Sequence, residues 1–115
     1  MEEYKILKNI KQAFESVNEN VEVEGIVYGL VNINNDYAGF LEDPNKNDCL
    51  LFGGTSNVRG LALLKYSERL EKPIIARGKI IDLEKISSTE SSVVSGKFLE
   101  VHSFEFFDYK TKIPG

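Results

Sequence analysis

The sequence predicts a mainly β domain: a closed five-stranded Greek-key barrel with one helix between its third and fourth strands and an additional N-terminal amphipathic helix. Three observations support this fold. The hydrophobic period changes from 3.6 to 2 residues near residue 20. The elements that follow come in the order three strands, one helix, two strands. Two strongly β-forming runs, 21–31 and 72–83, each contain a central glycine, which weakens a flat strand but permits the sharp bends of a small barrel.

The size and composition are those of one soluble globular domain. A chain of 115 residues can bury one core, and its 42% hydrophobic and 28% charged residues are ordinary for this class. No apolar run approaches the roughly 20 residues of a membrane helix, and no charged-then-apolar leader follows Met1. We therefore expect a cytoplasmic protein, or a nuclear one in a eukaryote, with no membrane partner. The expected organisation is an N-terminal helix at 1–20 packed on a barrel at 21–115.

The N-terminal segment, residues 2–18, is expected to be the amphipathic helix. Apolar residues recur there at three- and four-residue spacing, and those expected to close an open end of the barrel are Leu7, Ile10, Phe14 and Val17. The pattern stops at an asparagine-rich stretch, 18–20, which favours leaving a helix. A helix lying in a membrane interface is disfavoured, because acidic residues balance the lysines and no tryptophan anchors the apolar face.

The rest of the chain divides at turn and capping signals. The expected elements are strands at 21–31, 37–43 and 48–53, a helix at 55–71, and strands at 74–83 and 96–107. Thr55 or Ser56 can cap the helix, and Pro73 ends it. The serine-rich stretch at 84–95 is expected to be a mobile loop between the last two strands.

Two details of the strands bear on the barrel. Gly25 or Gly29 in the first strand and Gly78 in the fourth are the expected corners, where a bend or bulge turns the strand. In the fifth strand the phenylalanines cannot all face one core unless a bulge reverses the alternation. At least one is therefore expected to be exposed or to be covered by the N-terminal helix: Phe98, Phe104, Phe106 or Phe107.

The runs "VEVEGIVYG", "YAGFLED", "RGKII" and "GKFLEVHSFEFF", with a helix between the second and third of them, carry a family resemblance. In this order, residues 21–107 resemble the OB (oligonucleotide/oligosaccharide-binding) fold. The resemblance is architectural, and an SH3-like barrel or an α+β sheet would produce much of the same pattern. It implies a binding surface across the second and third strands, flanked by the loops that join strands one to two and four to five.

Aromatic residues near this implied surface are candidates for stacking on single-stranded nucleic acid, namely Tyr28, Tyr37, Phe40 and Phe52. Half of the residues in any barrel strand point inward, so most of these four are expected in the core. The charge is also unfavourable. Residues 21–53 hold six acidic side chains and one lysine, and such a surface repels phosphates. Direct binding of DNA or RNA is therefore expected to be weak.

The positive charge lies later in the chain, on the helix and the fourth strand. Residues 54–83 hold six basic and three acidic side chains. The candidate binding residues among them are Arg59 and Lys65 on the helix, and Ile75, Arg77, Lys79 and Ile81 on one face of the fourth strand. The simpler interpretation of that face is a solvated barrel exterior. The alternative is a mixed apolar and basic surface for a protein partner or for phosphates.

The sequence lacks the residue combinations of several common catalytic and metal sites. Cys49 is the only cysteine and His102 is the only histidine. The sequence therefore lacks the cysteine and histidine clusters that zinc sites and Cys-His catalytic sites need. Glu42 and Asp43 are neighbours in a strand, so they point to opposite faces and cannot act as a pair. "FGGT" lacks the spacing and the lysine of a phosphate-binding loop. We expect no catalytic residue, no metal and no cofactor.

Three functions remain from the sequence. The first is a non-catalytic binding module that contacts a protein partner, with a nucleic-acid-handling assembly implied by the fold resemblance alone. The second is a direct, weak binder of single-stranded DNA or RNA. An enzyme is the least favoured of the three.

Overall fold

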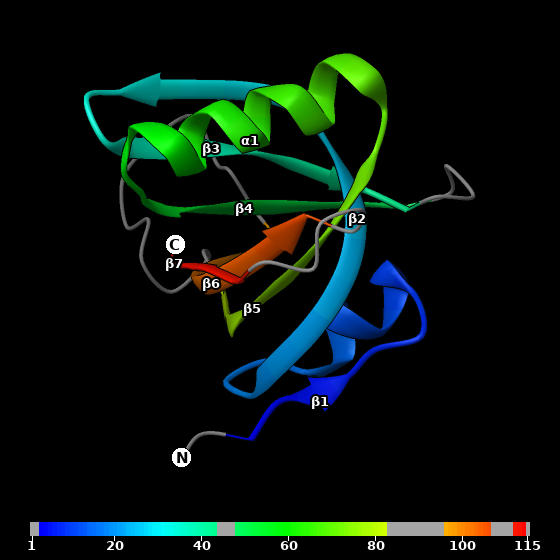
Figure 1. Ribbon diagram of the computed structural model, residues 1–115. Coiled ribbons are helices and arrows are strands. Elements are labelled where there is room, and N and C mark those ends of the chain that lie inside the picture. The colour runs from blue at the N-terminus through cyan, green and yellow to red at the C-terminus, as the bar shows by residue number, and fades with distance from the viewer. Residues whose placement is uncertain (1–2, 44–47, 83–95, 107–111, 115) are drawn as a thin grey trace, which may run out of the picture.

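The barrel closes because one long strand, β2 (Asn20–Ile33), pairs with two different neighbours. Its first half runs antiparallel to β5 (Pro73–Asp82), and its second half runs antiparallel to β3 (Asp36–Glu42). Ile26 belongs to both pairings and marks the change of partner. In the computed structural model, which describes residues 3–43, 48–82, 96–106 and 112–114, β2 bends strongly along its length (Figure 1).

The remaining pairings complete the ring. β3 pairs antiparallel with β4 (Cys49–Thr55), β4 pairs parallel with β6 (Lys97–Phe106), and β6 pairs antiparallel with β5. The strand order is therefore β2-β3-β4-β6-β5 and back to β2. This confirms the predicted five-stranded barrel. A short strand that the sequence did not predict, β7 (Lys112–Pro114), adds to β6. The expected loop at 84–95 lies outside the described residues.

The helix between the third and fourth barrel strands is present as α1 (Val58–Leu70). Its N-cap is Asn57, whose side chain accepts a hydrogen bond from the Gly60 N–H at 2.8 Å. The predicted caps are wrong, because Thr55 still belongs to β4 and Ser56 precedes Asn57. None of the helices in the described part of the chain is long and apolar enough to span a membrane.

The prediction of an N-terminal amphipathic helix is wrong. The segment forms a two-residue strand, β1 (Lys5–Ile6), parallel to β2, and a six-residue 3-10 helix, η1 (Ile10–Glu15). Asn9 separates them, because its backbone is extended and its side chain accepts a hydrogen bond from the Gln12 N–H at 3.1 Å. An asparagine that caps from this position starts a new helix and cannot continue one across it.

The N-terminal segment nevertheless packs on the barrel, on the side opposite to α1 (Figure 1). Leu7, Ile10 and Ala13 are buried in the core. The N–H of Ile10 donates to the carboxylate of Asp43 at 3.4 Å, which ties η1 to the end of β3. Phe14 is 38% exposed, so its expected place in the core is wrong.

The core is continuous through the barrel, and a bulge in β6 decides which phenylalanines join it. Register with β5 shifts between Arg77 and Gly78, so that His102 is an extra residue on β6. Leu99 and Val101 before the bulge and Phe104 and Phe106 after it are all buried. The side chain of Phe98 has the opposite orientation and lies on the outer face of the barrel. Phe107 falls outside the described residues.

Two of the three expected glycine corners coincide with irregular register. Gly29 has a φ of 65° and lies where the pairing of β2 with β3 shifts. Gly78 lies at the β6 bulge, and a Cβ there would overlap the carbonyl oxygen of Glu100. Both strands therefore turn where the sequence predicted, and at Gly78 only glycine fits.

Candidate binding surface

Strand register places five apolar side chains in one line across the outside of the barrel. Neighbouring members are paired residues on neighbouring strands, and the line runs Tyr28, Phe40, Leu51, Phe98, Ile81. All five are exposed or half-buried, while the residues on either side of Phe40 and Leu51 in sequence are buried. We call this line the apolar row.

One end of the apolar row is an aromatic stack. The rings of Tyr28 and Phe40 lie 5.3 Å apart, centre to centre, with an angle of 24° between their planes. The two side chains are 41% and 38% exposed, so the stack is accessible to a ligand. The hydroxyl of Tyr28 and the sulfur of Cys49 are 3.3 Å apart. This hydrogen bond is the main cause that raises the pKa of Tyr28, with smaller contributions from burial and from the charges of Cys49 and Glu42.

In the middle of the row, Phe98 lies against the backbone of β4 at Gly53. A Cβ built on Gly53 would be 2.9 Å from the Cζ atom of Phe98 and 2.8 Å from the carbonyl oxygen of Tyr37. The absence of a side chain at Gly53 thus makes room for the Phe98 ring. Strand alternation alone does not reveal this contact, because it depends on the parallel pairing of β4 with β6.

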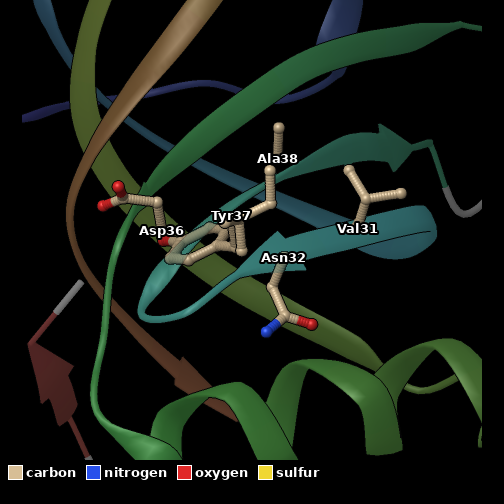
Figure 2. A pocket seen from close by; sticks show the side chains of 6 residues that line it. Val31, Asn32, Asp36, Tyr37 and Ala38 are labelled. Carbon is tan, nitrogen blue, oxygen red and sulfur yellow. The ribbon is translucent and has the colours of Figure 1, made fainter.

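The β2–β3 hairpin extends the surface beyond the row (Figure 2). Val31 pairs with Ala38 and Ile33 pairs with Asp36, and Ile33 is 79% exposed. These side chains border a cavity of about 300 Å³, whose full lining is Val31, Asn32, Ile33, Asp36, Tyr37 and Ala38. In Figure 2 the side chain of Asn32 points toward α1, whereas Val31 and Ala38 point away from it. The cavity has mainly apolar walls and a carboxylate at its edge.

Carboxylates surround the apolar surface. Asp36 accepts a hydrogen bond from the Thr55 hydroxyl at 2.7 Å and is exposed. Glu42 is paired with Cys49, next to the aromatic stack, and Glu100 is paired with Gly53, next to Phe98. Lys79 is paired with Glu100 on the same outer face. The rim is therefore acidic beside the aromatic stack and the hairpin, and mixed in charge beside Ile81.

The basic residues of the neighbouring strands are mostly neutralised. The Nε atom of Arg77 is 2.9 Å from Glu22, and its Nη1 atom is 2.9 Å from Glu105. Burial alone would lower the pKa of Arg77, but the hydrogen bonds and charges of these two carboxylates raise it. Lys97 pairs with Asp82 at 3.3 Å. These cations hold the barrel strands together and are not available to phosphates.

The predicted site residues are thus divided among several environments. Tyr28, Phe40 and Ile81 lie on the apolar row, as a ligand surface requires. Tyr37 and Phe52 are buried and pack together in the core with ring centres 5.7 Å apart. The prediction of Phe52 as a ligand-contacting aromatic is therefore wrong, and Tyr37 reaches the surface only where it lines the hairpin cavity.

The other predicted residues lie off the row. Ile75 and Lys79 are half-buried on the outer face of β5, and Arg59 and Lys65 are exposed on α1. Prediction missed the contribution of Leu51, Phe98, Val31 and Ile33. The alternation in "DCLLFG" indicated an outward Leu51, but the other three depend on bulges. Among the described residues no three His, Cys, Asp or Glu side chains are grouped to hold a metal ion.

Comparison with known proteins gives the fold. No protein-family model and no curated protein matches the sequence. Solved structures do match: a putative aspartyl-tRNA synthetase from Leishmania major Friedlin (TM-score 0.62, 12% identity, 92% of this chain and 21% of that one) and asparaginyl-tRNA synthetase from Pyrococcus horikoshii (TM-score 0.57, 16% identity, 92% and 22%). An OBody bound to hen egg-white lysozyme also matches (TM-score 0.52, 12% identity, 81% and 85%).

The chain spans about a fifth of the length of the two synthetases. At these identities the likeness concerns the fold alone. Together with the closed barrel of five strands, it shows that the chain has an OB fold, as its sequence resemblance predicted.

Proposed function

We propose that this chain is a non-catalytic OB-fold binding module that contacts a protein partner through the apolar row and the adjacent β2–β3 hairpin. The observation that carries the proposal is the row itself. Five side chains from five strands form one apolar line on the outside of the barrel, where water would otherwise cover them. A continuous exposed apolar surface with a polar rim is typical of protein interfaces.

The charges favour a protein over a nucleic acid at this surface. Asp36, Glu42 and Glu100 border it, and Arg77 is already held by two carboxylates. A phosphate backbone would lose the counterion release that drives most nucleic-acid binding. A partner segment with apolar side chains and nearby lysines or arginines would satisfy both the row and its rim.

The fold likeness supports both a partner and a context. One of the matching structures, the OBody bound to hen egg-white lysozyme, is a protein of similar fold in complex with another protein. The matches to tRNA synthetases are the basis for placing the proposed partner in a nucleic-acid-handling assembly.

A second candidate function rests on one specific observation, the Tyr28–Phe40 stack. Exposed aromatic rings bind unpaired bases, at about 1–3 kcal/mol per stacked base. With an acidic rim, such binding of single-stranded RNA or DNA would be weak.

The position of Cys49 allows a direct test. It is the only cysteine in the sequence and is exposed beside Tyr28. A benzophenone maleimide attached there would crosslink whatever covers the row in an extract of the native cells. We expect one stoichiometric protein, insensitive to nuclease and lost with Phe40→Ser. In the control variant, Cys49→Ser removes the original thiol, and Lys11→Cys, on η1, provides the thiol that carries the same label.

The outcomes separate the candidates. A crosslink to RNA or DNA would support the second function and contradict the first. The same products from the labels at positions 49 and 11 would show that the row is not a specific binding surface.

A further inference from the structure

The outward face of α1 carries an apolar ridge that no part of the described chain covers. Val58, Ala62, Tyr66 and Leu70 follow each other at intervals of four residues and are all exposed, Val58 by 79%. Side chains spaced by four form one continuous ridge on an α-helix. The ridge extends over about 18 Å, the rise of twelve residues.

Tyr66, in the centre of the ridge, is held in place by its neighbours. Its ring lies 5.9 Å from the ring of the buried Phe106. The guanidinium carbon of Arg69 lies 6.0 Å from the centre of the same ring. The Tyr66 ring is therefore positioned before any partner binds, which reduces the entropy cost of binding at the centre of the ridge.

The cations beside this ridge differ from those on the barrel strands. Arg59, Lys65 and Arg69 are exposed, and none of them makes an ion pair with the described residues. Glu68, an acidic residue of α1, is turned to the barrel, where it accepts a hydrogen bond from the Leu30 N–H at 3.1 Å. Glu71 lies beyond the helix as its C-cap, in the left-handed conformation. The exposed face is thus apolar and positive, on a chain whose net charge is −4.

From these observations we propose that the outward face of α1 is a second docking surface, which takes an acidic amphipathic helix of a partner protein. The three exposed cations without ion pairs are electrostatically complementary to an anionic partner. The four-residue ridge fits the groove between the side chains of another helix, the commonest way in which helices pack. A phosphate backbone would satisfy the cations but would leave Val58 and Leu70 in water, which favours protein over nucleic acid.

This surface lies on a helix that is separate from the strands of the apolar row, so the inference does not depend on the proposed function. A contact of one helix face is smaller than a standard protein interface. We therefore expect micromolar affinity for an isolated helix.

The test uses a synthetic 18-residue probe, stapled as a helix, with leucines on one face and glutamates on the others. Its binding to the full chain is measured by fluorescence anisotropy. One control probe has the same composition in scrambled order. A second control probe has lysine in place of glutamate. We expect each control to bind at least tenfold more weakly than the probe.

Variants locate the contact. Lys65→Glu with Arg69→Glu should weaken binding of the acidic probe at least tenfold, and Val58→Ser should weaken it several-fold. The matched control, Lys8→Glu with Lys11→Glu, makes the same charge change on the N-terminal segment and should leave binding unchanged. Phe40→Ser, on the apolar row, should also leave it unchanged. Circular dichroism confirms that every variant is folded.

Three results would overturn the inference. Equal binding of the scrambled probe would show that binding depends only on the net charge of the peptide. Binding of the oligonucleotide dT15 that is lost with Lys65→Glu and Arg69→Glu, without binding of the acidic helix, would identify phosphates as the ligand. Self-association of the chain in sedimentation experiments that the same substitutions abolish would identify a second copy as the occupant.

Discussion

Arg77 and Glu22 lie opposite each other where β5 and β2 close the barrel, with the arginine Nε 2.9 Å from the glutamate oxygen. Glu105 approaches the same guanidinium from β6, so one arginine joins three strands. This arrangement explains why the most prominent cation on the barrel strands does not contribute a site for phosphates. It also makes Arg77 a structural residue.

The first prediction concerns this ion triad. Arg77→Ala should lower the free energy of unfolding by about 2 kcal/mol, because it removes charged hydrogen bonds and leaves two half-buried carboxylates facing each other. Lys79→Ala, two residues along the same face, should cost less than about 0.5 kcal/mol. Urea unfolding of both variants measures the difference. Equal losses would show that the triad contributes nothing beyond an ordinary surface position.

The second prediction concerns the N-terminal segment. Ile10 is fully buried and Phe14 is partly exposed. Ile10→Ala should therefore destabilise the fold by about 2–5 kcal/mol. Phe14→Ala should cost clearly less, although phenylalanine is the larger residue. A greater loss for Phe14→Ala in the same unfolding experiment would place Phe14 in the core and contradict the observed 3-10 helix.

The third prediction concerns the bulge at Gly78. Gly78→Ala places a methyl group in steric overlap with the backbone oxygen of Glu100, which a side-chain rotation cannot relieve. We expect a loss of at least about 3 kcal/mol, or failure to fold. Gly29→Ala is the comparison, since its strain comes from a φ of 65°, and should cost about 1–2 kcal/mol. Thermal melts rank the two variants, and a mild effect at Gly78 would mean that β6 can shift its register.

The fourth prediction concerns alkaline pH. Burial raises the pKa of Tyr37 far above its usual value of about 10. The folded state keeps this phenol protonated, whereas the unfolded state releases the proton above pH 10, so stability should fall as pH rises beyond 10. The slope for one proton is about 1.4 kcal/mol per pH unit. Urea unfolding between pH 8 and pH 11 should show this loss, and Tyr37→Phe should flatten it. An unchanged slope in that variant would assign the effect to another group.

Much of the barrel could be predicted from the sequence because its strands alternate regularly. On β5 the inward residues Ile74, Ala76 and Ile80 are buried, as predicted, and Arg77 and Lys79 lie on the opposite face. The order of elements restricted the topology further, since a helix between the third and fourth strands suits few small barrels.

The errors arose where periodicity does not determine structure. Spacing of three and four residues before residue 18 fits an α-helix, but Asn9 interrupts it with a local hydrogen bond. The outward position of Phe98 depends on an extra residue in β6, and the pairing of Arg77 with Glu22 depends on which strands become neighbours. Non-local contacts of this kind leave no local signal, so the sequence allowed the cations of β5 to be a solvated exterior or a binding surface and did not predict their ion pairs.

The fifth prediction separates the two candidate functions of the apolar row. A labelled single-stranded oligonucleotide, tested once as DNA and once as RNA, should bind with micromolar or weaker affinity at physiological salt, because Glu42 and Glu100 border the row. Phe40→Ala should weaken whatever binding remains, since it removes half of the aromatic stack. Arg77→Ala should not flatten the salt dependence, because its charge is already neutralised. Nanomolar binding would instead establish the row as a nucleic-acid site. A salt slope that falls by about one phosphate contact in Arg77→Ala would show that a ligand can displace Glu22 from the arginine.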